Sequence, residues 1–219
     1  MNYPLTEYKT FVFDCDGVIL NSNKVKTEAF YKAALPFGEK AASSLVDYHV
    51  NNGGISRYKK FEWFLSKIKG EIDPELLKFL LEDYATFVSE GLNSCDLVSG
   101  LAEFREATGD ANWLIVSGGD QQELRSVFEK RNISDFFDGG IFGSPDTKEV
   151  ILRRELQRFN IELPALFLGD SRYDHEAARG SNIDFLFLSY WTEFKGWKEY
   201  CDENSIRSLD KFPNKEFHE

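Results

Sequence analysis

Short apolar runs recur along the chain, and most of them end in polar residues or glycines. The first is Phe11–Phe13, and similar runs occupy 113–116, 140–143, 165–168 and 185–188. Apolar runs of this length without alternating polar residues are typical of strands buried on both faces of a parallel sheet. Segments with helical periodicity at 121–130, at 147–159 and from about 171 to 179 separate the later runs. This alternation predicts an α/β fold with a Rossmann-like parallel sheet.

Residues 21–92 have a different pattern, with helical periodicity and no convincing strand. The predicted helices cover 24–35, 39–50, 56–69 and 74–90. The last has Asp73 as an N-cap and Pro74 at its first position, and Gly91 supplies a stop. An all-helical insertion after the first strand predicts a separate small domain. We therefore expect an α/β core domain at 1–20 and 93–219 and a helical domain at 21–92.

Composition narrows the function classes. The net charge is -11, which argues against nucleic-acid partners because they require a basic surface. The sequence has no basic-then-apolar leader and no apolar run long enough for a membrane span, so we expect a cytoplasmic protein with no membrane partner. The three widely spaced cysteines are expected to be reduced thiols. The aromatic tail from Trp191 is expected to pack on the core, leaving a monomer or a weak homodimer.

Two carboxylates, Asp14 and Asp16, follow the first strand directly. Open α/β sheets place their ligands at the carboxyl ends of their strands. Side chains alternate along an extended chain, so Asp14 and Asp16 are expected to face one side with Cys15 opposite. Two facing carboxylates repel unless a cation or a shared proton neutralises them. The pair therefore predicts a site for a divalent metal and a phosphate, although Asp-Gly is also a common turn pair.

The other strand ends carry complementary groups: Ser117 and Gly118 after one, Asp170 after another, with Asp174 one helical turn later. Lys148 begins the helix after 143–146. Each has a structural alternative, because Ser117 could cap a helix, Lys148 could be solvated, and the two aspartates could complement a helix N-terminus. Their joint placement at the strand ends favours phosphoryl transfer, which depends on positioning and on electrostatic stabilisation.

These motifs resemble those of the haloacid dehalogenase superfamily of hydrolases, in the phosphatase-like branch with an inserted helical cap that includes phosphoglycolate phosphatases and β-phosphoglucomutases. The Asp-x-Asp-Gly-Val signature matches 14–18, and the Ser/Thr motif matches 116–118. The lysine motif Gly-x-Pro-x-x-Lys matches 143–148, and the acidic motif Gly-Asp-Ser-x-x-Asp matches 169–174. All four motifs occur in the family's order and span nearly the whole chain.

The resemblance implies a mechanism. Asp14 would attack phosphorus to form an aspartyl-phosphate, and Asp16 would act as general acid and base with a raised pKa. Mg²⁺ would be held by Asp14, the Asp16 backbone carbonyl and Asp170. Asp174 would be a direct ligand, or would orient Lys148 or a metal-bound water. Ser117 and the Gly118 amide would bind phosphoryl oxygens, and Lys148 would neutralise charge.

The segment 54–57 of the helical insertion, Gly-Ile-Ser-Arg, resembles the cap of β-phosphoglucomutase-like enzymes, where the arginine meets a second phosphate. Arg57 is therefore a candidate substrate-binding residue. Lys59 and Lys60 lie beside Glu62, and at least one of them is expected on a solvated helix face. No role is expected for the three histidines, at 49, 175 and 218.

The sequence thus predicts a Mg²⁺-dependent phosphatase acting on a small phosphorylated metabolite, such as a sugar phosphate or a phosphoglycolate-like acid. A phosphosugar mutase is the alternative, because hydrolase and mutase share the core motifs and differ in how the cap holds a second phosphate. A non-catalytic binding protein with this fold is a third possibility, which the intact set of motif residues argues against.

Overall fold

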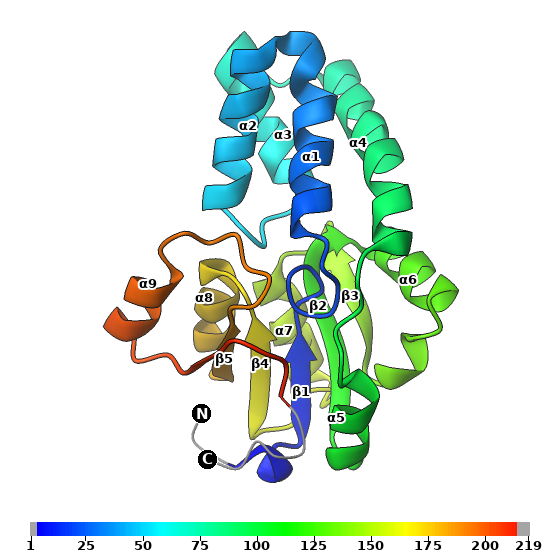
Figure 1. Ribbon diagram of the computed structural model, residues 1–219, viewed down its shortest axis with the longest axis vertical. Coiled ribbons are helices and arrows are strands. Elements are labelled where there is room, and N and C mark those ends of the chain that lie inside the picture. Colours follow the sequence, from blue (N-terminus) through cyan, green and yellow to red (C-terminus); the bar gives the residue numbers. More distant parts are fainter. Residues whose placement is uncertain (1–3, 214–219) are drawn as a thin grey trace.

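The computed structural model describes residues 4–213, so His218 lies outside the described residues. These residues contain a six-stranded parallel sheet in the order β3-β2-β1-β4-β5-β6 (Figure 1). The strands are β1 (Thr10–Phe13), β2 (Asn112–Asp120), β3 (Gly140–Ser144), β4 (Ala165–Gly169), β5 (Asp184–Leu188) and β6 (Ser208–Leu209). The predicted α/β class and parallel sheet are confirmed.

Helices cover both faces of the sheet because alternate side chains of its central strand point to opposite faces. Phe11 and Phe13 of β1 belong to one apolar cluster, together with side chains of α5 (Leu101–Ala107) and α6 (Gln121–Lys130). Val12 belongs to a second cluster, formed with side chains of α7 (Lys148–Gln157), α8 (Arg172–Gly180) and α9 (Trp197–Glu203). Central β1 is therefore buried on both sides, and its carboxyl end has a fixed position.

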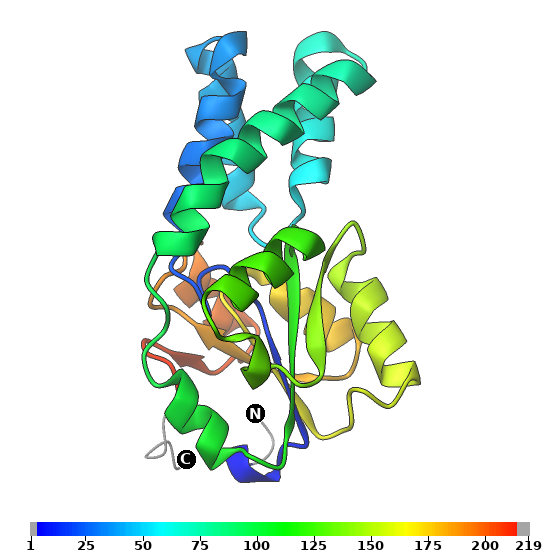
Figure 2. The ribbon, with the colours of Figure 1, turned by 90° about the vertical axis from the view of Figure 1, so that its right-hand side faces the viewer.

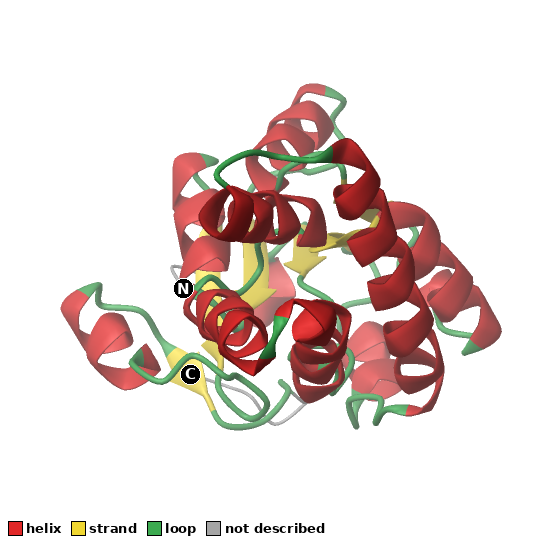
Figure 3. Ribbon diagram, turned by 90° about the horizontal axis from the view of Figure 1, so that it is seen from above, coloured by secondary structure: helices red, strands yellow, loops and turns green. Residues whose placement is uncertain are grey.

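The helical insertion stands above the carboxyl ends of the strands (Figures 1 and 3). Its helices, called the cap here, are α1 (Asn23–Ala34), α2 (Glu39–Asn51), α3 (Arg57–Lys69) and α4 (Pro74–Ser94). Their own apolar core contains Phe30, whose ring centroid is 4.4 Å from that of Tyr84 and 5.2 Å from that of Phe61. The domain boundaries at 20/21 and 92/93 stay a prediction.

Helix α4 corrects one expectation, because it does not stop at Gly91 but continues to Ser94 (Figure 2). A Cβ at position 91 would lie 2.3 Å from Cγ1 of Val25 on α1. The glycine therefore allows two cap helices to pack closely and is not a helix end.

Other differences from the prediction lie at the edges of the core. Strand β2 extends through 117–120, beyond the predicted run 113–116, with a register shift against β3 between Val116 and Asp120. Helix α5 and strand β6 were not predicted, and neither were the single-turn 3-10 helices Leu5–Glu7, Leu35–Phe37 and Ser134–Phe136. The aromatic tail packs on the core as expected, with the Trp197 ring stacked on Phe187 at 5.5 Å between centroids.

All three cysteines are unpaired. Among the helices that the structure describes, none combines the length and the apolar character needed to cross a membrane.

Candidate active site

Asp14 lies at the carboxyl end of β1 and is almost fully buried. Its backbone N–H donates to the Leu168 carbonyl of β4 at 3.0 Å, and its Oδ1 accepts the N–H of Cys15 at 2.7 Å. Its Oδ2 lies 2.9 Å from Nζ of Lys148. Burial raises the pKa of Asp14 to about 7, and Lys148 opposes this rise. A cation at this carboxylate favours the ionised form, which a nucleophile requires.

Lys148 and Asp174 form a buried pair that links helices α7 and α8. Nζ of Lys148 donates to Oδ1 of Asp174. Oδ2 of Asp174 accepts the N–H and hydroxyl of Ser171 at 3.0 and 2.7 Å and the N–H of Asp170 at 3.2 Å. Burial disfavours the charge of Lys148, but Asp14 and Asp174 outweigh it and raise the pKa of the ammonium group above its ordinary value. Both oxygens of Asp174 are therefore used to orient neighbours, Lys148 above all.

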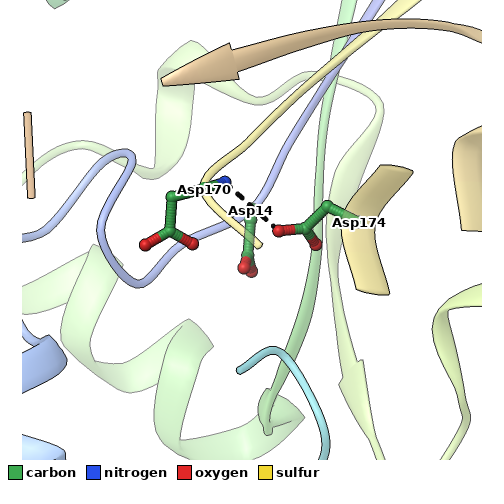
Figure 4. Close-up of side chains that lie close together, drawn as sticks. All are labelled: Asp14, Asp170 and Asp174. Carbon is green, nitrogen blue, oxygen red and sulfur yellow. Dashed lines mark hydrogen bonds between the residues drawn. The ribbon is translucent and has the colours of Figure 1, made fainter. Parts of the chain in front are cut away.

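Oxygens of Asp14, Asp170 and Asp174 lie within 4.8 Å of one another, and all three residues are buried (Figure 4). Burial, together with the charges of Asp174 and Asp14, raises the pKa of Asp170 well above its ordinary value. Oδ2 of Asp170 accepts Nδ2 of Asn23 at 2.8 Å. Hard carboxylate oxygens that repel one another in a buried cluster are the donor set that Mg²⁺ prefers. The residues present therefore fit a magnesium ion.

Asp16 differs from the expectation, because its pKa is lowered. Its Oδ2 accepts Nζ of Lys26 at 2.5 Å and its Oδ1 accepts the hydroxyl of Ser22 at 2.6 Å. Burial alone would raise this pKa, yet the charge and hydrogen bond of Lys26 hold it below its ordinary value. Asp14 and Asp16 both line the same cavity, but their carboxylates pair with different lysines.

Ser117 and Gly118 lie within β2, and Ser117 is fully buried. The Ser117 hydroxyl accepts the N–H of Gly119 at 3.1 Å. It does not cap the following helix, because Asp120 does so by accepting two N–H groups of the first turn of α6 at 3.0 Å. The capping alternative for Ser117 is therefore wrong.

The loop between α2 and α3 enters the site from the cap. A Cβ at Gly118 would lie 2.1 Å from the carbonyl oxygen of Gly54, and one at Gly54 would lie 3.6 Å from Nζ of Lys148. The loop thus lies directly over the strand ends. A cavity of about 290 Å³ remains between cap and core, and its lining includes Asp14, Asp16 and Asp170.

Arg57 lines this cavity and also ties the cap to the core. Its guanidinium forms two hydrogen bonds with the Glu123 carboxylate of α6, one of them from Nη1 to Oε2 at 3.1 Å. Next to it, the Tyr58 hydroxyl donates to Oδ2 of Asp120 at 2.9 Å. The sequence predicted a substrate contact for Arg57, and in this conformation its charge is already neutralised.

The structure also places the two cap lysines, Lys59 and Lys60, and the histidines His49 and His175. Lys59 is exposed and paired with Glu62 at 2.8 Å, so one lysine lies on a solvated face as predicted. Lys60 is instead buried beside His49, in the lining of the cavity. His175 is hydrogen-bonded to the Tyr200 hydroxyl at 2.7 Å, in keeping with its expected structural role.

Sequence reasoning missed several residues that touch the site: Ser22, Asn23, Lys26, His49, Lys60 and Glu123. Ser22 and Asn23 contact the carboxylates of Asp16 and Asp170. Their position directly after the first motif was the available signal. For Lys60 the signal was its spacing, because it lies four residues before Phe64 on the apolar face of α3.

Comparison with known proteins agrees with this geometry. Residues 8–182 match the model of the haloacid dehalogenase-like hydrolase family. None of the curated proteins compared with the chain matches it.

Among solved structures, the chain is similar to a "predicted phosphatase from Clostridium acetobutylicum", with 18% identity, TM-score 0.73 and coverage of 93% of this chain and 94% of that one. It is also similar to a "predicted phosphoglycolate phosphatase" from Haemophilus somnus, with 19% identity, TM-score 0.66 and coverage of 85% and 87%. A β-phosphoglucomutase from Clostridium difficile gives 18% identity, TM-score 0.70 and coverage of 93% and 91%. At these identities the structures show a shared fold, and the family match over most of the chain shows that this protein belongs to the haloacid dehalogenase-like hydrolases.

Proposed function

We propose that the protein is a Mg²⁺-dependent phosphatase that hydrolyses a small phosphorylated metabolite through an aspartyl-phosphate on Asp14. The observation that carries the proposal is the cluster of Asp14, Asp170 and Asp174 around Lys148, buried at the strand ends next to the cavity under the cap. A single cation, Lys148, pairs with two of the three carboxylates. A divalent ion and a phosphoryl group complement such a cluster.

In the first half-reaction an oxygen of Asp14 attacks phosphorus, and the bond from phosphorus to the leaving oxygen breaks. Lys148, 2.9 Å from Oδ2 of Asp14, favours the ionised form of that carboxylate against the effect of burial and would offset negative charge on the transferring group. The Gly118 amide and the Ser117 hydroxyl are assigned to the phosphoryl oxygens. Asp174 acts as a positioning residue, because its two oxygens hold Lys148 and Ser171.

Asp16 is assigned to proton transfer at the leaving oxygen and at the attacking water. The pairing with Lys26 keeps it ionised in this conformation, which suits the general base of the second half-reaction. It must carry a proton before it serves as the acid of the first half-reaction. Asp14 and Asp170 would hold Mg²⁺ together with the Asp16 backbone carbonyl, and the ion would neutralise phosphoryl charge when bound.

A phosphosugar mutase is the second candidate, and the placement of Arg57 favours it. Arg57 lines the cavity from the cap, and the resemblance to β-phosphoglucomutase-like caps assigns this arginine to a second phosphate. Its pairing with Glu123 has to be broken or shared for such a contact, which makes hydrolysis the simpler proposal.

The test is phosphate release from a panel of phosphorylated metabolites, with and without Mg²⁺. The proteins compared are wild type, Asp14→Asn, and Asp146→Asn as a control that removes a surface carboxylate paired with Arg154. Mg²⁺-dependent release that Asp14→Asn abolishes and Asp146→Asn retains supports the phosphatase. Isomerised sugar phosphates without release support the mutase, and neither product from any compound contradicts both.

A further inference from the structure

Lys60 is a buried cation in the cap wall of the cavity. It projects from α3, is 2% exposed, and its Nζ lies 2.7 Å from Nδ1 of His49 on α2. Its ammonium also lies 5.5 Å from the ring centroid of Phe30. Lys60 and His49 both line the cavity that reaches Asp14. The side chain is therefore placed to touch whatever fills the upper part of this cavity.

Charge pairing sets Lys60 apart from the other cations in the cavity wall. Lys26 pairs with Asp16, Arg57 with Glu123, and Arg172 with Glu176. Within residues 4–213, Lys60 has no carboxylate at ion-pair distance, and its close polar partner is an imidazole nitrogen. A buried ammonium without a counterion is costly, and an anionic ligand that reaches it reduces this cost.

The short contact excludes the doubly protonated Lys60–His49 pair, in which both nitrogens would be donors. Two nitrogens at 2.7 Å share one proton, either from the ammonium to a neutral imidazole or from Nδ1–H to a neutral amine. Burial lowers the pKa of Lys60 to about 7, and the charges of Lys26 and Lys148 add to this while Asp16 and Asp14 oppose it. Burial, Lys60 and Lys26 likewise lower the pKa of His49. The pair therefore changes charge near neutral pH.

We propose that Lys60 binds a second anionic group of the substrate, a carboxylate or a phosphate remote from the transferred phosphoryl group, and takes up a proton as that group binds. This deepens the proposed phosphatase function and rests on it. The proton passes from water or buffer to Nζ, so that one N–H bond forms and one bond of the proton donor breaks. The ammonium then donates to Nδ1 of His49 and to the anion. Glu123 already neutralises the charge of Arg57. Lys60 is therefore the cap residue whose charge the anionic group of the substrate neutralises.

The proposal predicts a preference for substrates that are anionic at both ends. A matched probe set is the three-carbon phosphate monoesters that end in a hydroxyl, a carboxylate or a second phosphate, with two- and four-carbon homologues to cover the span. Lys60→Met removes the charge at nearly constant volume. Lys59→Met removes the same charge from the exposed neighbour and serves as the control.

We expect wild type to favour the anionic-ended esters over the hydroxyl-ended ester in kcat/KM by about 10-fold or more, since charge-assisted hydrogen bonds are about 1.5–3 kcal/mol. Lys60→Met should lose this preference mainly through a higher KM and turn over the hydroxyl-ended ester within about 3-fold of wild type. Lys59→Met should keep the preference. Comparison of the carboxylate-ended ester with the phosphate-ended ester shows which anion the site accepts.

Proton uptake provides a readout that a purely structural role would not change. In an Asp14→Asn background, calorimetry in buffers of different ionisation enthalpy measures the protons bound with each ester near pH 7. The anionic-ended ester should take up more protons than the hydroxyl-ended ester, and Lys60→Met should remove the difference. An equal affinity of the two esters for Asp14→Asn, or a difference that survives Lys60→Met, overturns the proposal.

The outcomes separate this proposal from the phosphatase function. Hydrolysis of all the esters at equal efficiency leaves the phosphatase standing and refutes the role of Lys60. Tighter binding of anionic-ended esters without any Mg²⁺-dependent hydrolysis supports the Lys60 contact and refutes the phosphatase.

Discussion

The Gly54 carbonyl of the cap lies against the Cα of Gly118 in the core, so closely that a Cβ at position 118 would be 2.1 Å from the Gly54 oxygen. Backbone groups of two segments more than 60 residues apart in sequence, 54 and 118, therefore meet over the strand ends. This contact exists only when the cap is closed on the core. Closure excludes water from the site and strengthens its electrostatic interactions.

Gly118→Ala is expected to prevent this closure, because the methyl group collides with backbone that has no rotamer to adopt. We expect kcat/KM to fall by about 100-fold or more, since misplacement of a catalytic site by about 1 Å has this effect. Gly119→Ala is the matched control, because the nearest atoms to its Cβ would belong to the Leu124 side chain, at 3.2 Å, which can shift. Steady-state kinetics and thermal unfolding of both variants check the prediction, and equal losses in the two would contradict it.

The ion pair between Arg57 of the cap and Glu123 of the core is expected to stabilise the closed position of the cap. The two side chains are 6% and 17% exposed, so removing one partner leaves a largely buried charge. Glu123→Gln should lower the free energy of unfolding by about 1–3 kcal/mol, less than for a fully buried pair because Glu123 reaches solvent. For a chain of this size this is a fall in Tm of roughly 2–10 °C.

Glu62→Gln is the control for this prediction, because its pair with Lys59 is 32% and 66% exposed. Glu62→Gln should lower the free energy of unfolding by less than about 1 kcal/mol. Limited proteolysis should also cut Glu123→Gln faster between cap and core. A Tm of Glu123→Gln equal to that of Glu62→Gln would mean that the pair does not hold the cap.

Magnesium should stabilise the protein through the carboxylate cluster. Binding to the native state at 100 times Kd adds about 2.7 kcal/mol, which is several degrees in Tm for a chain of this length. Asp170→Asn should lose most of this shift, because a neutral amide binds the cation more weakly than a carboxylate does. Asp146→Asn, which lacks a surface carboxylate, should keep it. A shift of equal size in Asp170→Asn would place the ion elsewhere.

Much of the core could be predicted because local signals and global fold agree there. Buried strands such as Phe11–Phe13 contain only apolar residues, and Asp73 with Pro74 marks a helix start unambiguously. The four motifs are contiguous segments of sequence, so their chemistry is visible without contacts. Gly91 misled the prediction because its reason, the contact with Val25, lies on another helix.

The cap side of the site could be predicted only in part. Lys60 shares the helical spacing of Phe64 and so lies on the buried face of α3, whereas Lys59 lies outside that face. The lowered pKa of Asp16 depends on Lys26, which reaches it only because α1 begins directly after the motif loop. Contacts between residues that meet through helix packing leave no local signal.

Lys60→Met gives the last prediction, on stability and its pH dependence. Burial lowers the pKa of Lys60 to about 7 from 10.5, so between these values the unfolded chain binds a proton that the folded chain does not. Stability of the wild type therefore rises with pH across this window, and at pH 7 and below the folded state carries the full cost of the buried charge. Each pKa unit corresponds to about 1.4 kcal/mol, so Lys60→Met should be more stable than wild type at pH 7 by up to about 4 kcal/mol.

The gain should shrink steadily as pH rises towards 10, because folding requires Lys60 to give up a proton, and this costs less as the pH approaches the pKa of 10.5 in the unfolded chain. Urea unfolding at pH 6, 7, 8 and 9 measures this difference, with Lys59→Met as the control whose curve should run parallel to that of wild type. His49 contributes in the same direction at lower pH, since its lowered pKa removes stability as pH falls below about 6.5. A Lys60→Met variant less stable than wild type at pH 7 would show that the ammonium is stabilised by the fold, and the cost on which its function rests would not exist.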